Sequence, residues 1–165
     1  MKIICLGDSY TEGYLVDKSY ADFLKDYGHQ VINLGKNGDR TSGMLERFKG
    51  EVCDIQIIFA GTNDFFDATS PDQVFENIKE LLNKSKGQKN IIIIPPLMEE
   101  DESYPRYAEM NEKINQLAAL EKNLKETIID ARKIKPSYID GLHMREDFHI
   151  KLAGEILNVI QKTQE

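Results

Sequence analysis

The sequence contains few cysteines and no long hydrophobic run. Its two cysteines, Cys5 and Cys53, lack metal-ligand spacing, and one pair does not make the disulfide framework of a small secreted domain. Both lie in or beside apolar segments, so we expect buried free thiols, which are typical of a reducing compartment. No apolar run approaches the roughly 20 residues of a membrane span. The chain starts with a single lysine followed directly by a short apolar segment, unlike a signal peptide. We therefore expect a cytoplasmic protein that does not associate with membranes.

Clustered positive charge is also absent. The net charge is −7, from 21 Lys and Arg against 28 Asp and Glu. Proteins that bind nucleic acids need grouped Lys and Arg side chains, so this composition argues against that class of partner. The phosphate-binding motif GxxxxGK[ST] is missing, as is GxGxxG after the first apolar run. At 165 residues, the chain is long enough for one domain with its own core but too short for two.

Apolar runs alternate with helical patterns along the chain. The apolar runs predict five strands, at Lys2–Leu6, Gln30–Leu34, Asp54–Ala60, Asn90–Ile94 and Thr127–Ala131. The helical patterns predict helices at Ser19–Tyr27, Thr41–Lys49, Ser70–Lys86 (ended by Gly87), Pro105–Leu124 and Phe148–Gln161. Several strands are apolar throughout, which is typical of parallel sheets covered on both faces. We therefore predict an α/β fold, a three-layer α/β/α, doubly wound, five-stranded parallel sheet with the flavodoxin-like order 2-1-3-4-5.

In such a sheet, ligands bind outside the carboxyl ends of the strands. Ser9 follows the first predicted strand, Gly38 the second and Asn63 the third, while Asp140 and His143 precede the last helix. A serine hydroxyl becomes a nucleophile when a histidine accepts its proton, and a carboxylate can orient that histidine. The backbone N–H groups of Ser9 and Gly38 and the side-chain amide of Asn63 could stabilise the oxyanion that forms. These residues therefore indicate acyl-transfer chemistry.

Four short motifs occur in order along nearly the whole chain: GDS at 7–9, NxGxxG at 33–38, GTND at 61–64 and DxxH at 140–143. Together they resemble the four blocks of the SGNH, or GDSL-type, superfamily of esterases and lipases. The resemblance implies one SGNH-hydrolase-like domain over residues 1–165 that acts on esters without a metal or cofactor. By position, it implies Ser9 as nucleophile, Gly38 and Asn63 as oxyanion-hole donors, and Asp140 with His143 completing a catalytic triad.

Two other histidines compete with His143 for the role of base. His149 also has an acid three residues before it, Glu146, so its spacing is the same. We favour His143 because Asp140 follows a strand-and-loop segment and matches the family block. His29 lies in a turn before the second strand, at the opposite edge of the sheet, where we expect a surface residue.

Other residues near the motifs are expected to have supporting roles. Tyr10, Tyr14 and Phe65 are possible lining residues of an acyl or alcohol pocket, and core packing is an alternative for each. Asp8 and Asp64 are expected to form hydrogen bonds within their loops. The acidic run Glu99–Glu102 is interpreted as a solvated loop that could also exclude anionic substrates.

The sequence thus predicts a serine ester hydrolase that cleaves small acyl or acetyl esters through an acyl-enzyme, with a small-molecule ester as its partner. A carbohydrate O-deacetylase or an acyltransferase built on the same residues is an alternative. A non-catalytic flavodoxin-like module that binds a nucleotide or phosphate is the alternative from another class. The sequence does not indicate an oligomeric state.

Overall fold

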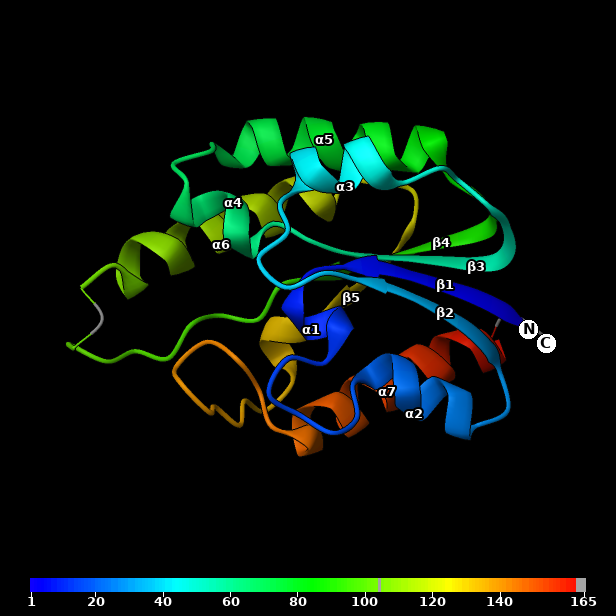
Figure 1. Ribbon diagram of the computed structural model, residues 1–165. Coiled ribbons are helices and arrows are strands. Elements are labelled where there is room, and N and C mark those ends of the chain that lie inside the picture. The colour runs from blue at the N-terminus through cyan, green and yellow to red at the C-terminus, as the bar shows by residue number, and fades with distance from the viewer. Residues whose placement is uncertain (104, 163–165) are drawn as a thin grey trace.

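The computed structural model describes residues 1–103 and 105–162. Its centre is a five-stranded, all-parallel sheet with the order β2-β1-β3-β4-β5, which confirms the predicted fold. The strands are β1 (Lys2–Gly7), β2 (Gln30–Gly35), β3 (Val52–Phe59), β4 (Lys86–Ile94) and β5 (Thr127–Asp130). All five carboxyl ends therefore lie at one edge of the sheet (Figure 1).

Helices cover both faces of this sheet. One face carries α1 (Ser9–Glu12), α2 (Tyr20–Asp26) and α7 (Glu146–Lys162). The other carries α3 (Thr41–Arg47), α4 (Thr62–Phe66), α5 (Pro71–Lys84) and α6 (Tyr107–Glu121) (Figure 1). A short 3₁₀ helix, η1 (Ala131–Lys133), follows β5. The longer predicted helices are all present, whereas α1 and α4 were not predicted.

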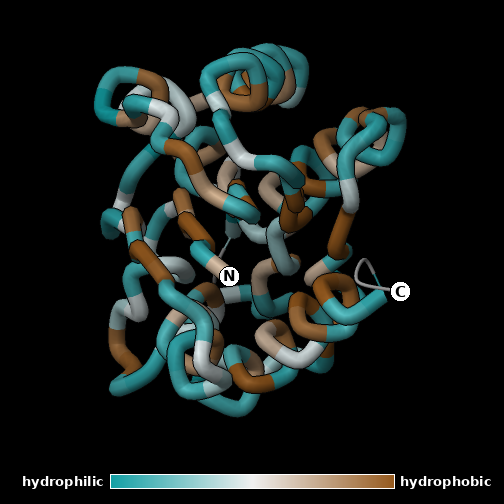
Figure 2. Tube along the Cα trace, turned by 90° about the vertical axis from the view of Figure 1, so that its right-hand side faces the viewer, coloured by the Kyte–Doolittle hydropathy of each residue, from teal (hydrophilic) through white to brown (hydrophobic). Residues whose placement is uncertain are grey.

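Two hydrophobic cores, one on each face, explain why the strands are apolar throughout. Successive residues of β4 point to opposite faces, so Ile91 and Ile93 pack against α2 and α7, while Ile92 packs against α5 and α6. All three isoleucines are buried. Figure 2 shows the hydrophobic segments gathered between the layers and the hydrophilic ones mainly at the outside. The sheet is therefore buried on both faces, as its apolar strands predict.

The start of β4 differs from the prediction. Helix α5 ends at Lys84, and the strand begins at Lys86 rather than at Asn90. The first residues of the strand are polar, but Lys86 and Gly87 pair with Val52 and Cys53 of β3. Gly87 is therefore a strand residue and not the end of a helix. Pairing with the neighbouring strand outweighs the weak local preference of this segment.

The two cysteines are buried and free, as predicted. Burial raises the pKa of the Cys5 thiol to about 12, which keeps it protonated at neutral pH. Within residues 1–103 and 105–162, no helix is both long and apolar enough to cross a membrane.

Candidate functional site

Ser9 stands where β1 turns into α1. Asp8 caps this short helix, and its carboxylate accepts a hydrogen bond of 3.0 Å from the Tyr10 N–H. Helix α1 lies so close to the strand ends that a Cβ at Gly7 would collide with Thr11. Only glycine permits this approach. The sequence GDS therefore turns the chain tightly and holds the Ser9 hydroxyl at the carboxyl edge of the sheet.

The loop before α7 brings His143 and Asp140 to Ser9. The Nδ1 of His143 lies 2.6 Å from Oδ2 of Asp140, and its Nε2 lies 3.1 Å from Oγ of Ser9. Because a carboxylate only accepts, Nδ1–H donates to Asp140, which leaves Nε2 free to accept from the Ser9 hydroxyl. Asp140 follows Ser9 by 131 residues in the sequence, yet in the fold the three side chains form one hydrogen-bonded chain.

Asp140 is held as a carboxylate. Partial burial acts to raise its pKa, but hydrogen bonds from the His143 ring and from the backbone N–H groups of His143 and Leu142 lower it below the ordinary value. Its Oδ1 accepts both backbone bonds, at 2.7 Å and 3.1 Å. A single turn of chain thus fixes both the ionisation of Asp140 and its contact with the imidazole.

Tyr10 connects the two loops. Its hydroxyl donates a 2.7 Å hydrogen bond to the carbonyl of Leu142, the residue before His143. Its ring stacks on Phe59 at 5.1 Å between centroids, and only 2% of the residue is exposed. The expectation that Tyr10 lines a pocket is therefore corrected: its ring packs in the core and ties the Ser9 helix to the His143 loop.

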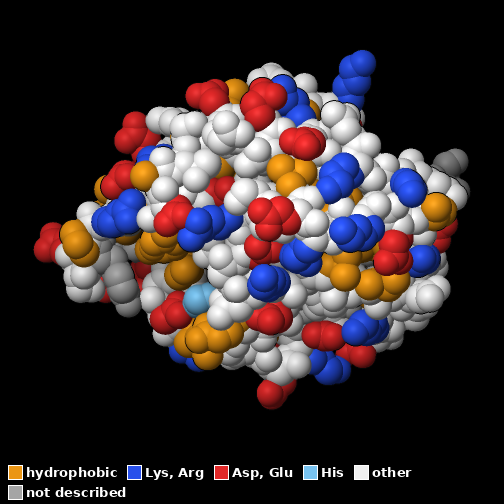
Figure 3. Space-filling view, turned by 45° about the horizontal axis from the view of Figure 1, so that its top comes forward, with side chains coloured by type: hydrophobic (Ala, Val, Ile, Leu, Met, Phe, Trp, Pro, Cys, Tyr) orange, Lys and Arg blue, Asp and Glu red, His pale blue; other side chains and the backbone are white. Residues whose placement is uncertain are grey.

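Phe65 also differs from the pocket expectation, because it is fully buried in the core beneath α5 and α6. Tyr14 is the exposed member of the three aromatic candidates, with 40% of its surface accessible. Its ring lies 4.8 Å from the ring of His143, at an angle of 57°. In the space-filling view, hydrophobic and acidic side chains surround a histidine at the molecular surface (Figure 3).

Three N–H groups are the candidates for stabilising an oxyanion at Ser9, namely the backbone N–H groups of Ser9 and Gly38 and the side-chain amide of Asn63. The side-chain amide of Asn63 donates to the carbonyl of Asp39 at 3.0 Å and to the carboxylate of Asp8 at 3.3 Å. Asn63 thereby links the residues adjacent to Gly38 and Ser9. The backbone N–H groups of Ser9 and Gly38 have no protein acceptor in the described part of the chain. Gly38 has φ of +74°, a left-handed conformation that favours glycine.

Asp64 is structural, as expected, since its carboxylate accepts from both the N–H and the hydroxyl of Thr41. Asp8 does more than was predicted, because it also contacts Asn63. It is 1% exposed. Burial, with a smaller effect of the Asp64 and Asp39 charges, raises its pKa to about 7.

We expect Asp8→Asn to remove the fall in stability with rising pH that the Asp8 carboxyl contributes to the wild type. A carboxyl in the unfolded chain has a pKa of about 3.9, so between pH 4 and 7 the folded protein holds a proton that the unfolded chain has lost. As the pH rises from 4 to 7, the free energy of unfolding of the wild type should therefore fall, relative to that of the variant, by roughly 1.4 kcal/mol per pH unit. Urea unfolding at several pH values measures the difference. Asp17→Asn, at an exposed carboxyl, controls for the loss of one charge, and equal slopes in wild type and Asp8→Asn would disprove the assignment.

The competing histidines lie elsewhere. His149 is 2% exposed, and its Nδ1 accepts a 3.2 Å hydrogen bond from the Tyr20 N–H in the core. Burial lowers its pKa to about 4, so it stays neutral at physiological pH. Glu146 instead accepts from the backbone of Lys18. His29 is half-buried at the edge where the strands begin, away from Ser9.

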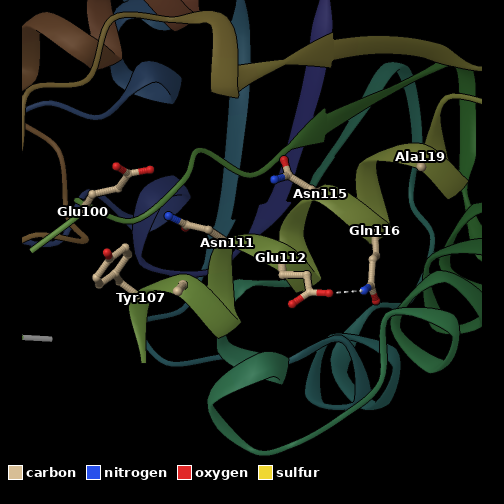
Figure 4. Close-up of a pocket in the computed structure, with 8 residues that line it drawn as sticks. Glu100, Tyr107, Asn111, Glu112, Asn115, Gln116 and Ala119 are labelled. Atoms are coloured by element: carbon tan, nitrogen blue, oxygen red, sulfur yellow. Dashed lines mark hydrogen bonds between the residues drawn. The ribbon is translucent and has the colours of Figure 1, made fainter. Parts of the chain in front are cut away.

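The acidic segment Glu99–Glu102 lies beside the His143 loop, since the Glu99 N–H donates to the carbonyl of Gly141 at 2.8 Å. From Glu100, a groove of about 660 Å³ runs along α6. It is lined mainly by polar side chains, several of them amides, among them Asn111, Asn115 and Gln116 (Figure 4). Ser9, Asp140 and His143 do not line this groove. No group of three or more His, Cys, Asp or Glu able to hold a metal ion occurs among the described residues.

The fold resembles those of solved GDSL-type hydrolases. A lipolytic protein of the G-D-S-L family from Veillonella parvula DSM 2008 matches with a TM-score of 0.81 and 18% identity over 98% of each chain. A lipase/acylhydrolase from Enterococcus faecalis matches with a TM-score of 0.78 and 26% identity over 98% of this chain and 96% of its own. A carbohydrate acetylesterase family member from Sinorhizobium meliloti matches with a TM-score of 0.78 and 18% identity over 98% of this chain and 97% of its own. No curated protein matches the sequence.

The fold is a three-layer α/β/α arrangement, and a serine, a histidine and an acid lie at the carboxyl edge of its sheet. The model of the GDSL-like Lipase/Acylhydrolase family matches residues 5–149, which include all four motifs. The chain belongs to this family.

Proposed function

We propose that the protein is a serine ester hydrolase that cleaves small acyl or acetyl esters through an acyl-enzyme. The observation that carries this proposal is the hydrogen-bonded chain from Ser9 Oγ through His143 to Asp140. His143 Nε2 accepts the proton of Ser9 as Oγ attacks the ester carbonyl. The imidazolium then protonates the leaving alcohol, and an acyl group remains on Ser9. In the second half, His143 activates water, which releases the acid and regenerates the hydroxyl.

In this proposal, the oxyanion of each tetrahedral intermediate accepts from the N–H groups of Ser9 and Gly38 and from the amide of Asn63. Both amide hydrogens of Asn63 already have protein acceptors. The longer bond, 3.3 Å to Asp8, is the one that the oxyanion replaces, while the bond to Asp39 persists. The buried Asp8 carboxyl favours its neutral form up to about pH 7, which limits its repulsion of the oxyanion.

Labelling with a fluorophosphonate tests the nucleophile directly. We expect the probe to modify the wild-type protein once, at Ser9, because only a hydroxyl activated by a base reacts at a useful rate. Intact mass followed by peptide mapping locates the adduct. His143→Ala should slow labelling strongly, whereas Ser42→Ala, at an exposed serine on α3, should not change it. An adduct on another residue, or none on folded protein, would contradict the assignment.

Acetylated carbohydrates are a second candidate class of substrate. The groove along α6 favours them, since amide, carboxylate and tyrosine side chains suit sugar hydroxyls and the groove begins near the His143 loop. The similarity to a carbohydrate acetylesterase family member agrees with this candidate. A panel of p-nitrophenyl esters of increasing acyl length, compared with acetylated sugars, separates the two classes by kcat/KM.

A further inference from the structure

Arg47, the last residue of α3, makes three hydrogen bonds at the carboxyl edge of the sheet. Its Nε donates to Oδ2 of Asp39 at 2.7 Å, and its Nη2 donates to the carbonyls of Gly7 at 3.1 Å and Leu34 at 2.8 Å. Gly7 lies two residues before Ser9, and Leu34 lies at the end of β2. One guanidinium therefore joins the chain segments that lead to two of the proposed oxyanion donors.

Asp39, its partner, connects to the third donor. The Asp39 carbonyl accepts from the Asn63 amide at 3.0 Å, and its N–H donates to Lys36, which closes the turn that contains Gly38. The Asp39 side chain is only 6% exposed. Its carboxylate is held by hydrogen bonds from the Arg47 guanidinium and from the Arg40 N–H. Asp39 thus contacts Asn63 through its backbone while its side chain is anchored to Arg47.

Gly43 gives independent support for this arrangement. It lies inside α3, where glycine is unfavourable relative to alanine. A Cβ at this position would collide with Oδ1 of Asp39. The helix therefore contains a glycine at the point where the carboxylate of Asp39 rests against it.

We propose that Arg47, acting through Asp39, is a positioning residue that holds the Gly38 turn and the Asn63 amide in place around the Ser9 nucleophile. Arg47 does not touch the substrate in this proposal. The fork of the guanidinium is what allows it to reach a carboxylate and two carbonyls together, which a lysine ammonium on a flexible stem does less well. The proposal rests on the proposed ester hydrolysis.

Steady-state kinetics on p-nitrophenyl acetate test it. We expect Arg47→Met to lower kcat by about 10- to 100-fold, less than the 10²- to 10³-fold typical of losing an oxyanion donor outright, with KM changed less than about threefold. Arg47→Lys should retain intermediate activity. The affinity for a phenylboronic acid, whose adduct with serine mimics the tetrahedral intermediate, should weaken in parallel with kcat.

Two matched controls separate positioning from folding. Arg132→Met breaks the ion pair between Arg132 and Asp130, which is buried to a similar extent as the pair between Arg47 and Asp39. It should leave kcat unchanged within about twofold. Gly43→Ala should reproduce part of the Arg47 defect, whereas Gly154→Ala, where a Cβ meets nothing within 4 Å, should not. Activities are normalised to the folded fraction from urea titrations, so that lost stability is not counted as lost catalysis.

The outcomes distinguish this proposal from the function on which it rests. Unchanged kcat and boronate affinity in Arg47→Met overturn the positioning role alone, provided that turnover still requires Ser9. A rise in KM at constant kcat also overturns it. Wild-type protein without esterase activity, or activity that persists in Ser9→Ala, overturns the proposed function and this proposal with it.

Discussion

Ser9→Ala is expected to lower kcat for a short p-nitrophenyl ester by at least about 10⁴-fold, because the proposed acyl-enzyme can no longer form. The substitution removes a single oxygen from a residue that is 5% exposed. The backbone bonds that hold α1, from the Gly13 and Tyr14 N–H groups to the Ser9 carbonyl, do not involve the hydroxyl. The free energy of unfolding should therefore change by only about 1 kcal/mol, the usual net value of one hydrogen bond.

The measurement pairs initial rates with urea unfolding of the same preparation. Ser42→Ala is the matched control, since it removes an exposed hydroxyl from α3, on the other face of the sheet, without touching His143. Binding of a product carboxylic acid should survive in Ser9→Ala, because the site around the missing hydroxyl remains. Turnover within tenfold of the wild type would mean that another nucleophile or a directly activated water does the chemistry.

The sheet and the ends of its strands could be predicted from the sequence because their signals are local and strong. The isoleucines of β3 and β4 form apolar runs that suit only a strand buried on both faces. Parallel topology then places every strand end at one edge, so Ser9, Asn63 and His143 could be grouped without coordinates. The structure places His143 within hydrogen-bond distance of both Ser9 and Asp140.

The supporting contacts could not be predicted in this way. Helices α1 and α4 have four and five residues, too few to show a helical period. Arg47 reads as an ordinary polar residue at a helix end, and only the folded chain shows that its three acceptors come from different segments. One signal was present: Gly43 within a predicted helix marks a position where something packs closely.

The two histidines of the final segment show where the same sequence pattern has two physical meanings. Each histidine follows an acid by three residues, at Asp140–His143 and Glu146–His149. In the first pair the side chains bond to each other, whereas in the second the acid binds the Lys18 backbone and the ring enters the core. Burial alone separates them, and burial depends on α2 packing against α7, which the spacing does not encode.

Substituting each histidine should therefore produce opposite losses. His143→Ala should reduce kcat by about 10³-fold or more, since no base then accepts the Ser9 proton. His149→Ala should leave the kcat of folded protein unchanged but cost about 2–4 kcal/mol of stability, because it leaves a cavity and an unpaired Tyr20 N–H in the core.

The pH dependence of stability gives a second, independent distinction between them. The pKa of His149 is lowered to about 4 in the fold, against about 6.5 in an unfolded chain, so between these values the unfolded chain binds the extra proton. The stabilising contribution of neutral His149 is therefore present above pH 6.5 and is lost as the pH falls toward 4. His149→Phe should remove this slope of roughly 1.4 kcal/mol per pH unit, while His143→Phe keeps it. If His149→Phe instead abolished turnover and His143→Phe did not, the catalytic base would be His149 and not His143. The hydrogen-bonded arrangement around Ser9 would then have no role in catalysis.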